Sequence, residues 1–297
     1  MRQKKLKNNA TRSRFSPLTI AMLIILLIYT VSLFALLLWG VLTAFKEPRF
    51  DFRTNRYGFP REWVWNFGQV FDSFTVSIKS GTGQVGFPKM LLYSVLYAVG
   101  CAFFHTLVPC LTAYVCARFK FRFLKLFHTI VIIVMVVPVV GSLPSELQMA
   151  RRFGLYDQIW GLWIMKANFL GMYFLVFYEI FRALPQTYTE AAKIDGAGNF
   201  SIMMRIALPL VRNTFLTVML INFITFWNDY QTPLIYLPSY PPVARAVYEL
   251  SNTTIGDLAY TPYRVAAAII LLIPIMVLFL AFQKRLLGNL TIGGLKG

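Results

Sequence analysis

Acidic residues are scarce in this chain of 297 residues: Asp and Glu together number 12, against 29 Lys and Arg. Charged residues of both signs make up only 14% of the sequence, whereas a soluble domain carries about 25%. The net charge of +17 could indicate a nucleic-acid-binding protein, but such proteins carry their Lys and Arg on folded aqueous domains. Here the basic residues stand between long apolar runs. The composition therefore argues against nucleic acid as a partner and indicates a protein of the lipid bilayer.

Cysteine and histidine are also few. Cys101, Cys110 and Cys116 have neither CxxC nor zinc-site spacing, so we expect them to be small buried hydrophobes. His105 and His128 are the two histidines, and neither an HExxH motif nor a serine with a partner base accompanies them. The sequence therefore predicts no catalytic residue, no metal site and no cofactor in this chain. Each histidine is expected to make a structural hydrogen bond.

One glycine pattern resembles a nucleotide-binding loop. Gly81, Gly83 and Gly86 fit GxGxxG, but Phe87 and Pro88 follow and lead into an apolar segment. A phosphate-binding loop of this type needs a strand before it and a soluble helix after it. We interpret the segment as a hinge, and we expect the chain to draw its energy from a partner.

Long hydrophobic runs dominate the sequence, which is 57% hydrophobic and 16% aromatic. A membrane-crossing helix needs about 20 mostly apolar residues. Six segments come close to this length and predict an all-α, polytopic membrane protein: Leu18–Leu42, Met90–Val115, Leu126–Val140, Ile159–Ile180, Thr214–Tyr236 and Val265–Phe282. The third is the shortest and runs into Pro138.

Basic residues give the predicted orientation. The tail over residues 1–16 is basic without an acid, the loop after the second span carries Arg118, Lys120, Arg122 and Lys125, and Lys284, Arg285 and Lys296 follow the last span. With six spans these three regions fall on one side, which the positive-inside rule makes cytoplasmic. The loop over residues 46–89 is also basic, but it is long and contains four acids, so its charge counts less in assigning the orientation. Both termini are therefore predicted to be cytoplasmic.

The segment between spans four and five then lies in the cytoplasm. Pro185 ends span four and can begin a new helix, so residues 186–194 predict about two helical turns, which Gly196 and Gly198 end. Asn199 or Ser201 can cap a second short helix, which Pro209 closes. An apolar stripe runs along this second helix: Ile202, Met203, Ile206 and Leu208.

The first of these short helices has the character of a docking surface. Ala191 and Ala192 leave it without bulk, so a partner can approach closely, and Glu190 can pair with a partner's arginine. The alternative is an amphipathic loop on the headgroups, which would carry Lys or Arg above large apolar residues. Here Glu190 and Asp195 stand beside the alanines, which favours docking.

The spacing of this segment resembles the EAA loop of ABC importer permeases. Glu-Ala-Ala at 190–192 is followed by three residues, Gly196, nine residues and then Ile-x-Leu-Pro at 206–209, which meets every fixed position of that loop. The predicted ATPase-docking residues are Glu190, Ala191, Ala192, Asp195, Gly196, Ile206, Leu208 and Pro209.

The likeness covers nearly the whole chain and is to the smaller permease of carbohydrate importers of the maltose-transporter type. Phe-Trp-Asn-Asp at 226–229 resembles that family's Trp-Asn-Asp/Glu element, and residues 288–297 resemble its Gly- and Lys-containing C-terminus. The resemblance implies an alternating-access permease of the prokaryotic plasma (inner) membrane, not itself an enzyme. It implies a heterodimer with a second permease and two ATP-hydrolysing subunits that use ATP and magnesium. It further implies an extracytoplasmic solute-binding protein that delivers a sugar or oligosaccharide.

Span five contains polar and aromatic residues that could line the substrate pathway: Asn222, Trp227, Asn228, Asp229 and Tyr230. Acids inside a membrane usually face a bundle interior or a water path, and an aromatic ring beside polar groups suits a sugar. A polar clasp between helices is the alternative. The sequence leaves both interpretations open.

The predicted organisation has five parts. They are a basic tail (1–16), a first transmembrane helix (17–45), an extracytoplasmic loop (46–89), a permease core (90–283) that contains the coupling loop (182–213), and a C-terminal tail (284–297). The aromatic-rich loop 46–89 matches no motif of the family. The alternative function is a stand-alone channel or a membrane-embedded enzyme, and neither needs a two-helix dock on its inner face.

Overall fold

The computed structural model describes residues 16–77, 83–119, 121–137, 141–252 and 259–290. Within these ranges the chain is mostly helical, and four helical segments are long and apolar enough to cross a membrane: Pro17–Ala44, Phe87–Arg118, Asn199–Trp227 and Thr261–Gln283. The predictions for the N-terminal tail, for the Gly81 end of the glycine pattern, for the end of the third span and for residues 291–297 lie outside the described residues.

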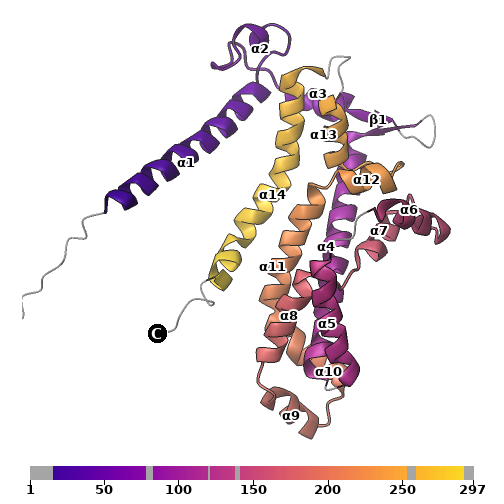
Figure 1. Ribbon diagram of the computed structural model, residues 1–297. Coiled ribbons are helices and arrows are strands. Elements are labelled where there is room, and N and C mark those ends of the chain that lie inside the picture. The colour runs from indigo at the N-terminus through magenta and orange to yellow at the C-terminus, as the bar shows by residue number, and fades with distance from the viewer. Residues whose placement is uncertain (1–15, 78–82, 120, 138–140, 253–258, 291–297) are drawn as a thin grey trace, which may run out of the picture.

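The elements follow one another as an elongated helical bundle with a small ribbon at one end (Figure 1). In chain order they are α1 (Pro17–Ala44), α2 (Asp51–Thr54), α3 (Asn66–Ser73), β1 (Thr75–Ser77), β2 (Gln84–Gly86), α4 (Phe87–Arg118), α5 (Arg122–Val136), α6 (Leu143–Arg152), α7 (Ile159–Lys166), α8 (Met172–Ala183), α9 (Thr187–Ile194), α10 (Asn199–Ile202), the π-helical segment η1 (Met203–Ala207), α11 (Leu208–Trp227), α12 (Gln231–Tyr236), α13 (Val243–Asn252) and α14 (Thr261–Leu290).

Helix α4 is the centre of the bundle, and α11, α8 and α7 pack along it. Small residues on its packed side let the neighbouring helices approach closely: Ala98, Cys101 and Ala102 are fully buried. Gly100 allows the closest approach, because a Cβ there would lie 2.1 Å from Nε1 of Trp163 on α7. Among the cysteines, Cys101 and Cys110 are buried and free, which confirms their predicted role as small hydrophobes.

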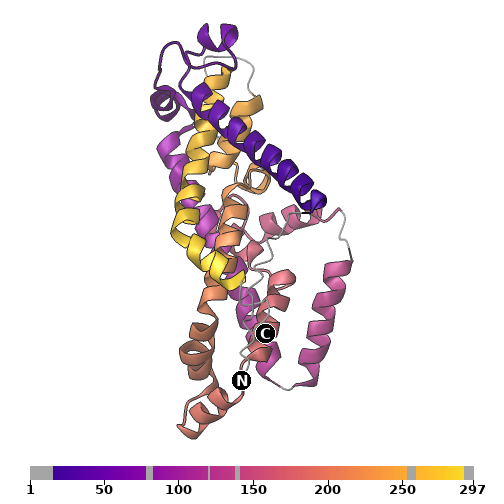
Figure 2. The ribbon, with the colours of Figure 1, turned by 90° about the vertical axis from the view of Figure 1, so that its left-hand side faces the viewer.

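Helix α1 stands apart from this bundle. It packs against α14 near one end and diverges from the body along the rest of its length (Figures 1 and 2). Every residue from Pro17 to Leu38 is exposed, and the helix is apolar all round. In water such a surface would be strongly unfavourable, so this helix is built for an apolar environment.

The prediction that the fourth span is one continuous helix is wrong. Residues 159–180 form two helices, α7 and α8, separated at residues 167–171. Asn168 and Gly171 are poor helix formers, and the side chain of Asn168 accepts a hydrogen bond from Leu170 N at 2.7 Å. The carbonyl oxygen of Lys166 accepts a hydrogen bond from Asn168 N at 2.8 Å and lies 2.8 Å from Nδ1 of His105. This contact confirms the structural hydrogen bond predicted for His105.

The predicted end of the fifth span and the stop at Pro209 also differ from the structure. Helix α11 ends at Trp227, with residues up to Tyr236 in the separate helix α12. Pro209 does not end a short helix: the chain is helical from residue 199 to residue 227. Proline has no N–H to bond the preceding turn, and the wider π-helical turn at Met203–Ala207 directly before it accommodates that loss.

The fold is not entirely α-helical. Strands β1 and β2 form a short antiparallel pair in which Val76 faces Val85, and both valines are buried. The ribbon, α2 and α3 gather at the end of the bundle opposite α9 (Figure 1). The two ends of the molecule are thus different in kind: loop and ribbon at one, the α9–α10 turn at the other.

Candidate functional site

The EAA-like segment begins where α8 stops. Leu184 has extended backbone dihedral angles, φ −67° and ψ 133°, which is the conformation that a following proline imposes. After Pro185 the chain turns and forms α9, with Gln186 at the N-cap position. The predicted first helix of the loop is therefore present with nearly the predicted bounds, and it protrudes from the end of the bundle (Figure 1).

A glycine turn ends α9 as predicted. Gly196 has φ +79°, a left-handed conformation that glycine adopts without a steric penalty. Gly196 N donates to Lys193 O at 3.0 Å, and Ala197 N donates to Ala192 O at 2.9 Å. This pair of bonds is the Schellman motif, and it fixes the direction in which α10 leaves.

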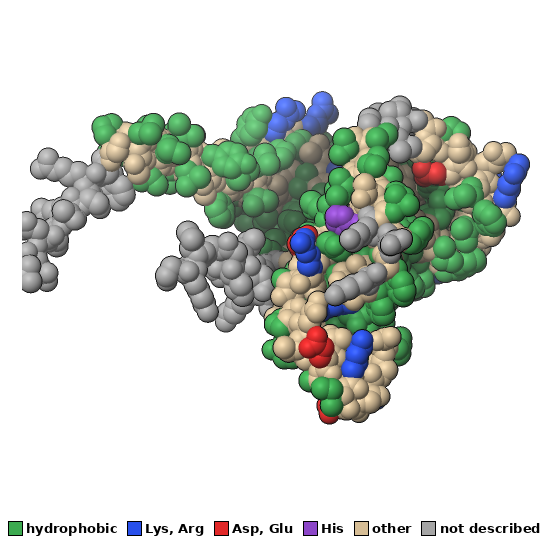
Figure 3. Space-filling model, turned by 60° about the horizontal axis from the view of Figure 1, so that its bottom comes forward, with side chains coloured by type: hydrophobic (Ala, Val, Ile, Leu, Met, Phe, Trp, Pro, Cys, Tyr) green, Lys and Arg blue, Asp and Glu red, His purple; other side chains and the backbone are tan. Residues whose placement is uncertain are grey.

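The outer surface of this turn is exposed and mixed in character. Ile194 is 87% exposed and Phe200 is 72% exposed, and Glu190, Ala191 and Asp195 are exposed beside them. Viewed from this end, apolar, acidic and basic side chains share the protruding tip (Figure 3). Large apolar side chains on a small rigid protrusion are typical of a protein-binding surface.

The structure divides the predicted docking residues into two groups. Glu190, Ala191, Asp195, Gly196 and Pro209 are exposed. The other three face the chain itself: Ala192 is 7% exposed, Ile206 is half-buried, and Leu208 packs against a core cluster that includes Phe181. The apolar stripe of the second helix therefore attaches the loop to the bundle and does not face outward.

A second contact ties the loop to α4. The guanidinium of Arg118 donates to Leu184 O at 3.1 Å, so the end of α4 holds the start of the loop. Beside it lies an open pocket of about 410 Å³, lined by Ala117, Arg118, Phe119, Phe121, Gln186, Thr189, Glu190 and Lys193. The start of the loop is thus joined to α8 through the chain and to α4 through Arg118.

The polar residues of the fifth span form a different kind of arrangement. Asn222 is 3% exposed and donates from Nδ2 to Thr106 Oγ1 at 3.0 Å. Trp227 is equally buried and donates from Nε1 to Leu271 O at 2.9 Å. These bonds join α11 to α4 on one side and to α14 on the other, as interhelical polar contacts do in membrane proteins.

Asp229 lies just past the end of α11 and has two partners. The hydroxyl of Tyr97 donates to Oδ2 of Asp229 at 2.8 Å, and Thr232 N donates to Oδ1 at 3.0 Å. The carboxylate therefore holds α4 and the first turn of α12 together. Tyr97 itself is 1% exposed, so its hydroxyl depends on this acceptor.

The last two residues of this predicted set face outward. Asn228 is exposed, and its side chain donates to Ile224 O within its own helix. Tyr230 is half-buried and stacks on Tyr248 of α13 with ring centroids 4.3 Å apart. The five residues do not converge on one point: three hold helices together and two present polar and aromatic surface.

Two structural side chains were not predicted from the sequence. Arg245 is 1% exposed and donates to Leu237 O at 2.8 Å and to Glu249 at 2.8 Å. Asp157 has φ +57° and accepts hydrogen bonds from the backbone and hydroxyl of Ser239. Asp157 has no local sequence signal, because Ser239 lies on another segment, whereas Arg245 and Glu249 form a local i,i+4 pair within α13.

Among the described residues, no group of three or more His, Cys, Asp or Glu side chains could hold a metal ion. The groups present bond to one another or point to the surface. A bundle of membrane-length apolar helices with a rigid exposed turn at one end is the architecture of a membrane transport subunit that works with partner proteins.

Comparison with known proteins defines the family. The chain belongs to the binding-protein-dependent transport system inner membrane components, whose family pattern matches residues 106–290. It is therefore a transport permease subunit of an ABC importer and not the catalytic subunit. This family membership sets aside the stand-alone channel and the membrane-embedded enzyme.

Individual relatives are similar in sequence to this chain over most of their length. The chain is 25% identical to the diacetylchitobiose uptake system permease protein NgcG of Streptomyces coelicolor, over 94% of this chain and 89% of that protein. It is 29% identical to the melibiose/raffinose/stachyose import permease protein MelC of Bacillus subtilis, over 63% of this chain and 68% of that protein. A crystal structure of a bacterial ABC transporter involved in the import of the acidic polysaccharide alginate has the same fold, with a TM-score of 0.72 at 20% identity. That match covers 89% of this chain and 95% of the solved one.

Proposed function

We propose that this chain is one half of the membrane pathway of a sugar or oligosaccharide importer, and that residues 182–213 are the loop that docks one ATPase subunit. The observation that carries the docking role is the α9–α10 turn. A Schellman motif fixes the turn, Arg118 holds the start of the loop at Leu184, and Glu190, Ala191, Ile194 and Phe200 lie exposed.

The proposed topology has six crossings with both termini in the cytoplasm. The four long helices α1, α4, α11 and α14 make four of them, α5 makes the third, and α7 together with α8 makes the fourth. The loop then lies on the side that carries the basic tails, which the positive-inside rule makes cytoplasmic. This orientation puts α9 where an ATPase would be.

The proposed assembly is a heterodimer with a second permease, two ATPase subunits that bind ATP and magnesium, and an extracytoplasmic solute-binding protein. Closure of the ATPase dimer moves the docked α9. Because α9 is joined to α8 through Pro185 and to α4 through Arg118, this motion turns the central helices together. Such rigid-body rocking switches access from one side of the membrane to the other.

The substrate class rests on the relatives, whose names describe uptake of chitobiose derivatives and of raffinose-type oligosaccharides. Of the fifth-span residues, Asn228 and Tyr230 are the proposed pathway surface, together with Tyr248 of α13 on which Tyr230 stacks, since these three are exposed or half-buried. Asn222, Trp227 and Asp229 serve the pathway indirectly by holding α11 against α4, α14 and α12.

Co-purification tests this function directly. The tagged chain, expressed with its own partner genes, should elute in mild detergent with a second permease and an ATPase dimer, and proteoliposomes of the complex should take up labelled oligosaccharide only with ATP and the binding protein. A matched control carries a Walker-type inactivating change in the ATPase, which leaves assembly intact. Stable homomers of this chain that transport without ATP would contradict the proposal.

A further inference from the structure

The loop that follows α1 has an unusual outer surface. Four aromatic side chains within nine residues are strongly exposed: Tyr57 (80%), Phe59 (72%), Trp63 (64%) and Trp65 (68%). Four arginines of the same segment are exposed as well: Arg49, Arg53, Arg56 and Arg61. Residues 47–65 are called the aromatic loop below.

The aromatic loop is held in shape by buried polar groups. The ammonium of Lys46, which is fully buried, donates to the carbonyls of Asn55 and Arg56, and Asn66 Nδ2 donates to Ala44 O at 2.8 Å and Lys46 O at 2.7 Å. Burial lowers the pKa of Lys46, while Asp51 opposes that shift. These bonds fix both ends of the loop to the last turn of α1.

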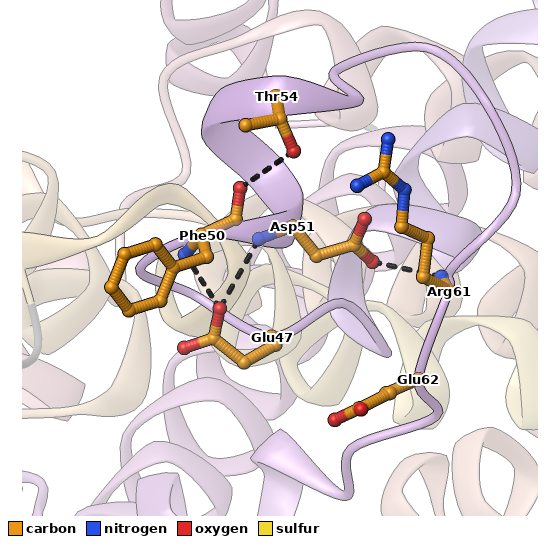
Figure 4. Close-up of a pocket in the computed structure, with 6 residues that line it drawn as sticks. All are labelled: Glu47, Phe50, Asp51, Thr54, Arg61 and Glu62. Atoms are coloured by element: carbon orange, nitrogen blue, oxygen red, sulfur yellow. Dashed lines mark hydrogen bonds between the residues drawn. The ribbon is translucent and has the colours of Figure 1, made fainter.

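The acids of the loop organise its interior. Glu47 accepts hydrogen bonds from Phe50 N and Asp51 N, and Asp51 accepts one from Arg61 N at 3.0 Å (Figure 4). Burial raises the pKa of Glu47, but its backbone hydrogen bonds and the charge of Arg49 outweigh this effect, so the pKa lies below the ordinary value. The exposed rings therefore stand on a defined scaffold.

The loop folds back along α1. Trp39 Nε1 donates to Arg56 O at 3.0 Å, and Trp39 lies five residues before the last residue of α1, Ala44. The ammonium of Lys46, two residues beyond Ala44, bonds the same carbonyl at 3.2 Å, so Arg56 lies beside the last turns of α1. Tyr57 is the next residue, so exposed rings flank the outer turns of an apolar helix.

That position matches the boundary between hydrocarbon and water. Tryptophan and tyrosine rings gather at this boundary, with their apolar bodies toward the chains and their polar atoms toward the headgroups. Arginine beside them can bind lipid phosphate in a bidentate way. Trp63 and Trp65 pack against Phe45, with ring centroids 5.6 and 5.8 Å away, which continues the exposed apolar surface of α1 into the loop.

We propose that the aromatic loop lies in the lipid headgroup region and anchors the outer end of α1 there. This inference rests on α1 crossing the membrane, as the proposed function requires. The lipid surface is favoured over a protein partner because Trp39 and Lys46 hold Arg56, and with it Tyr57, beside the last turns of the apolar helix α1. A surface for a protein in the aqueous phase would extend away from the membrane.

Spin-label depth measurements test this anchor on the assembled transporter. A nitroxide is placed at Tyr57→Cys, and separately at Phe59→Cys, in a background in which Cys101, Cys110 and Cys116 are replaced. The complex is reconstituted in nanodiscs of phosphatidylethanolamine and phosphatidylglycerol. Leu27→Cys, in the middle of α1, is the deep reference, and Asp72→Cys, exposed on α3 at the same end of the molecule, is the aqueous reference.

Collision rates with oxygen and with a water-soluble nickel chelate then give the depth. The expected result is an oxygen-to-nickel ratio at positions 57 and 59 that lies between the two references. A nickel-rich ratio equal to that of position 72 would overturn the anchor, and protection only after addition of the binding protein would assign the surface to that protein. Protection from both reagents at all times would assign it to the second permease. Uptake by the same samples is measured in parallel, so failure of the anchor is separable from failure of the transport function.

Discussion

Two polar segments interrupt the apolar chain, and they differ in what their side chains contact. At the α9–α10 turn, Glu190, Ala191 and Asp195 are exposed, and Glu190 has no ion pair within the described part of the chain. Within α11 and just after it, Asn222 and Asp229 bond to other helices. Both segments were predicted from the same kind of signal, which is polar residues next to an apolar span.

The contrast separates two uses of polarity in a membrane protein. A buried polar group that is fully bonded holds its own fold, because leaving it unpaired would cost about 1–3 kcal/mol. An exposed charge on a rigid turn has little effect on its own fold and is free to bind a partner. The comparison predicts that changes at α11 reduce stability, while changes at α9 reduce coupling and leave stability intact.

Asp229→Leu should have the largest effect on stability. A small effect would contradict the distinction between the two polar segments. The change removes the acceptor of the buried Tyr97 hydroxyl, at about 1–3 kcal/mol, and the acceptor of Thr232 N in α12, at about 1 kcal/mol more. We expect a clearly lower unfolding temperature of the purified complex in scanning fluorimetry and less assembled complex.

Asp229→Asn is the matched control for this prediction, because it keeps the shape and an acceptor oxygen while removing the charge. It should lose much less stability than the leucine variant. If both variants assembled normally and changed only the sugar-stimulated uptake, Asp229 would belong to the pathway and not to the clasp.

The accuracy of the prediction from sequence also differs between the two segments. The α9 helix and its glycine stop were predicted with nearly the right bounds, because Pro185 and Gly196 are local signals that act through backbone sterics. The inward packing of Ala192 and Leu208 was not predicted. For Ala192 the reason is that α9, with eight residues, has no periodicity long enough to show which side faces the bundle.

The errors in the spans have a similar cause. Hydropathy alone joined α7 to α8 and α11 to α12, since the breaks at residues 167–171 and 228–230 lie inside apolar stretches. The contacts that stabilise those breaks come from far along the chain: His105 at the first and Tyr97 at the second. Such long-range bonds leave no local pattern, and the same holds for the bonds between Asp157 and Ser239.

Glu190→Lys tests the other segment, the exposed turn, where a change should reduce coupling and leave stability intact. A charge-assisted contact with a partner's arginine contributes about 1.5–3 kcal/mol, so its reversal should weaken ATPase binding roughly tenfold or more. Uptake should fall and ATP hydrolysis should become uncoupled from it, while the unfolding temperature of the isolated chain stays near that of the wild type. Lys193→Glu, a reversal three residues away on α9, serves as the control for a general charge effect. Equal losses in both variants would point to overall charge and not to a specific contact at Glu190.

Gly196→Val should have a smaller effect of the same kind. The left-handed φ of +79° costs a residue with a Cβ about 1–2 kcal/mol, and no atom lies within 4 Å of the added Cβ, so the strain is confined to the turn. Coupling should weaken by roughly tenfold without loss of assembly. Gly198→Ala is the control, because Gly198 has φ −72° and equally open surroundings. Unchanged coupling in the valine variant would show that the direction of α10 does not matter for docking.

Cysteine substitution for thiol labelling should perturb the protein least. It distinguishes the exposed residues of span five from those that hold helices together. Asn228 is exposed, whereas Asn222 is 3% exposed between α11 and α4. In a background without the three native cysteines, Asn228→Cys should react with a small water-soluble thiol reagent at a rate that changes with the ATP state, because alternating access opens the pathway to one side at a time. Asn222→Cys should remain unreactive in every state, and Ser94→Cys, a buried position on α4, gives the background rate. If position 228 stayed unreactive in all states, Asn228 would face lipid or the second permease, and the pathway surface would then have to lie on other residues, with Tyr230 and Tyr248 the next positions to label.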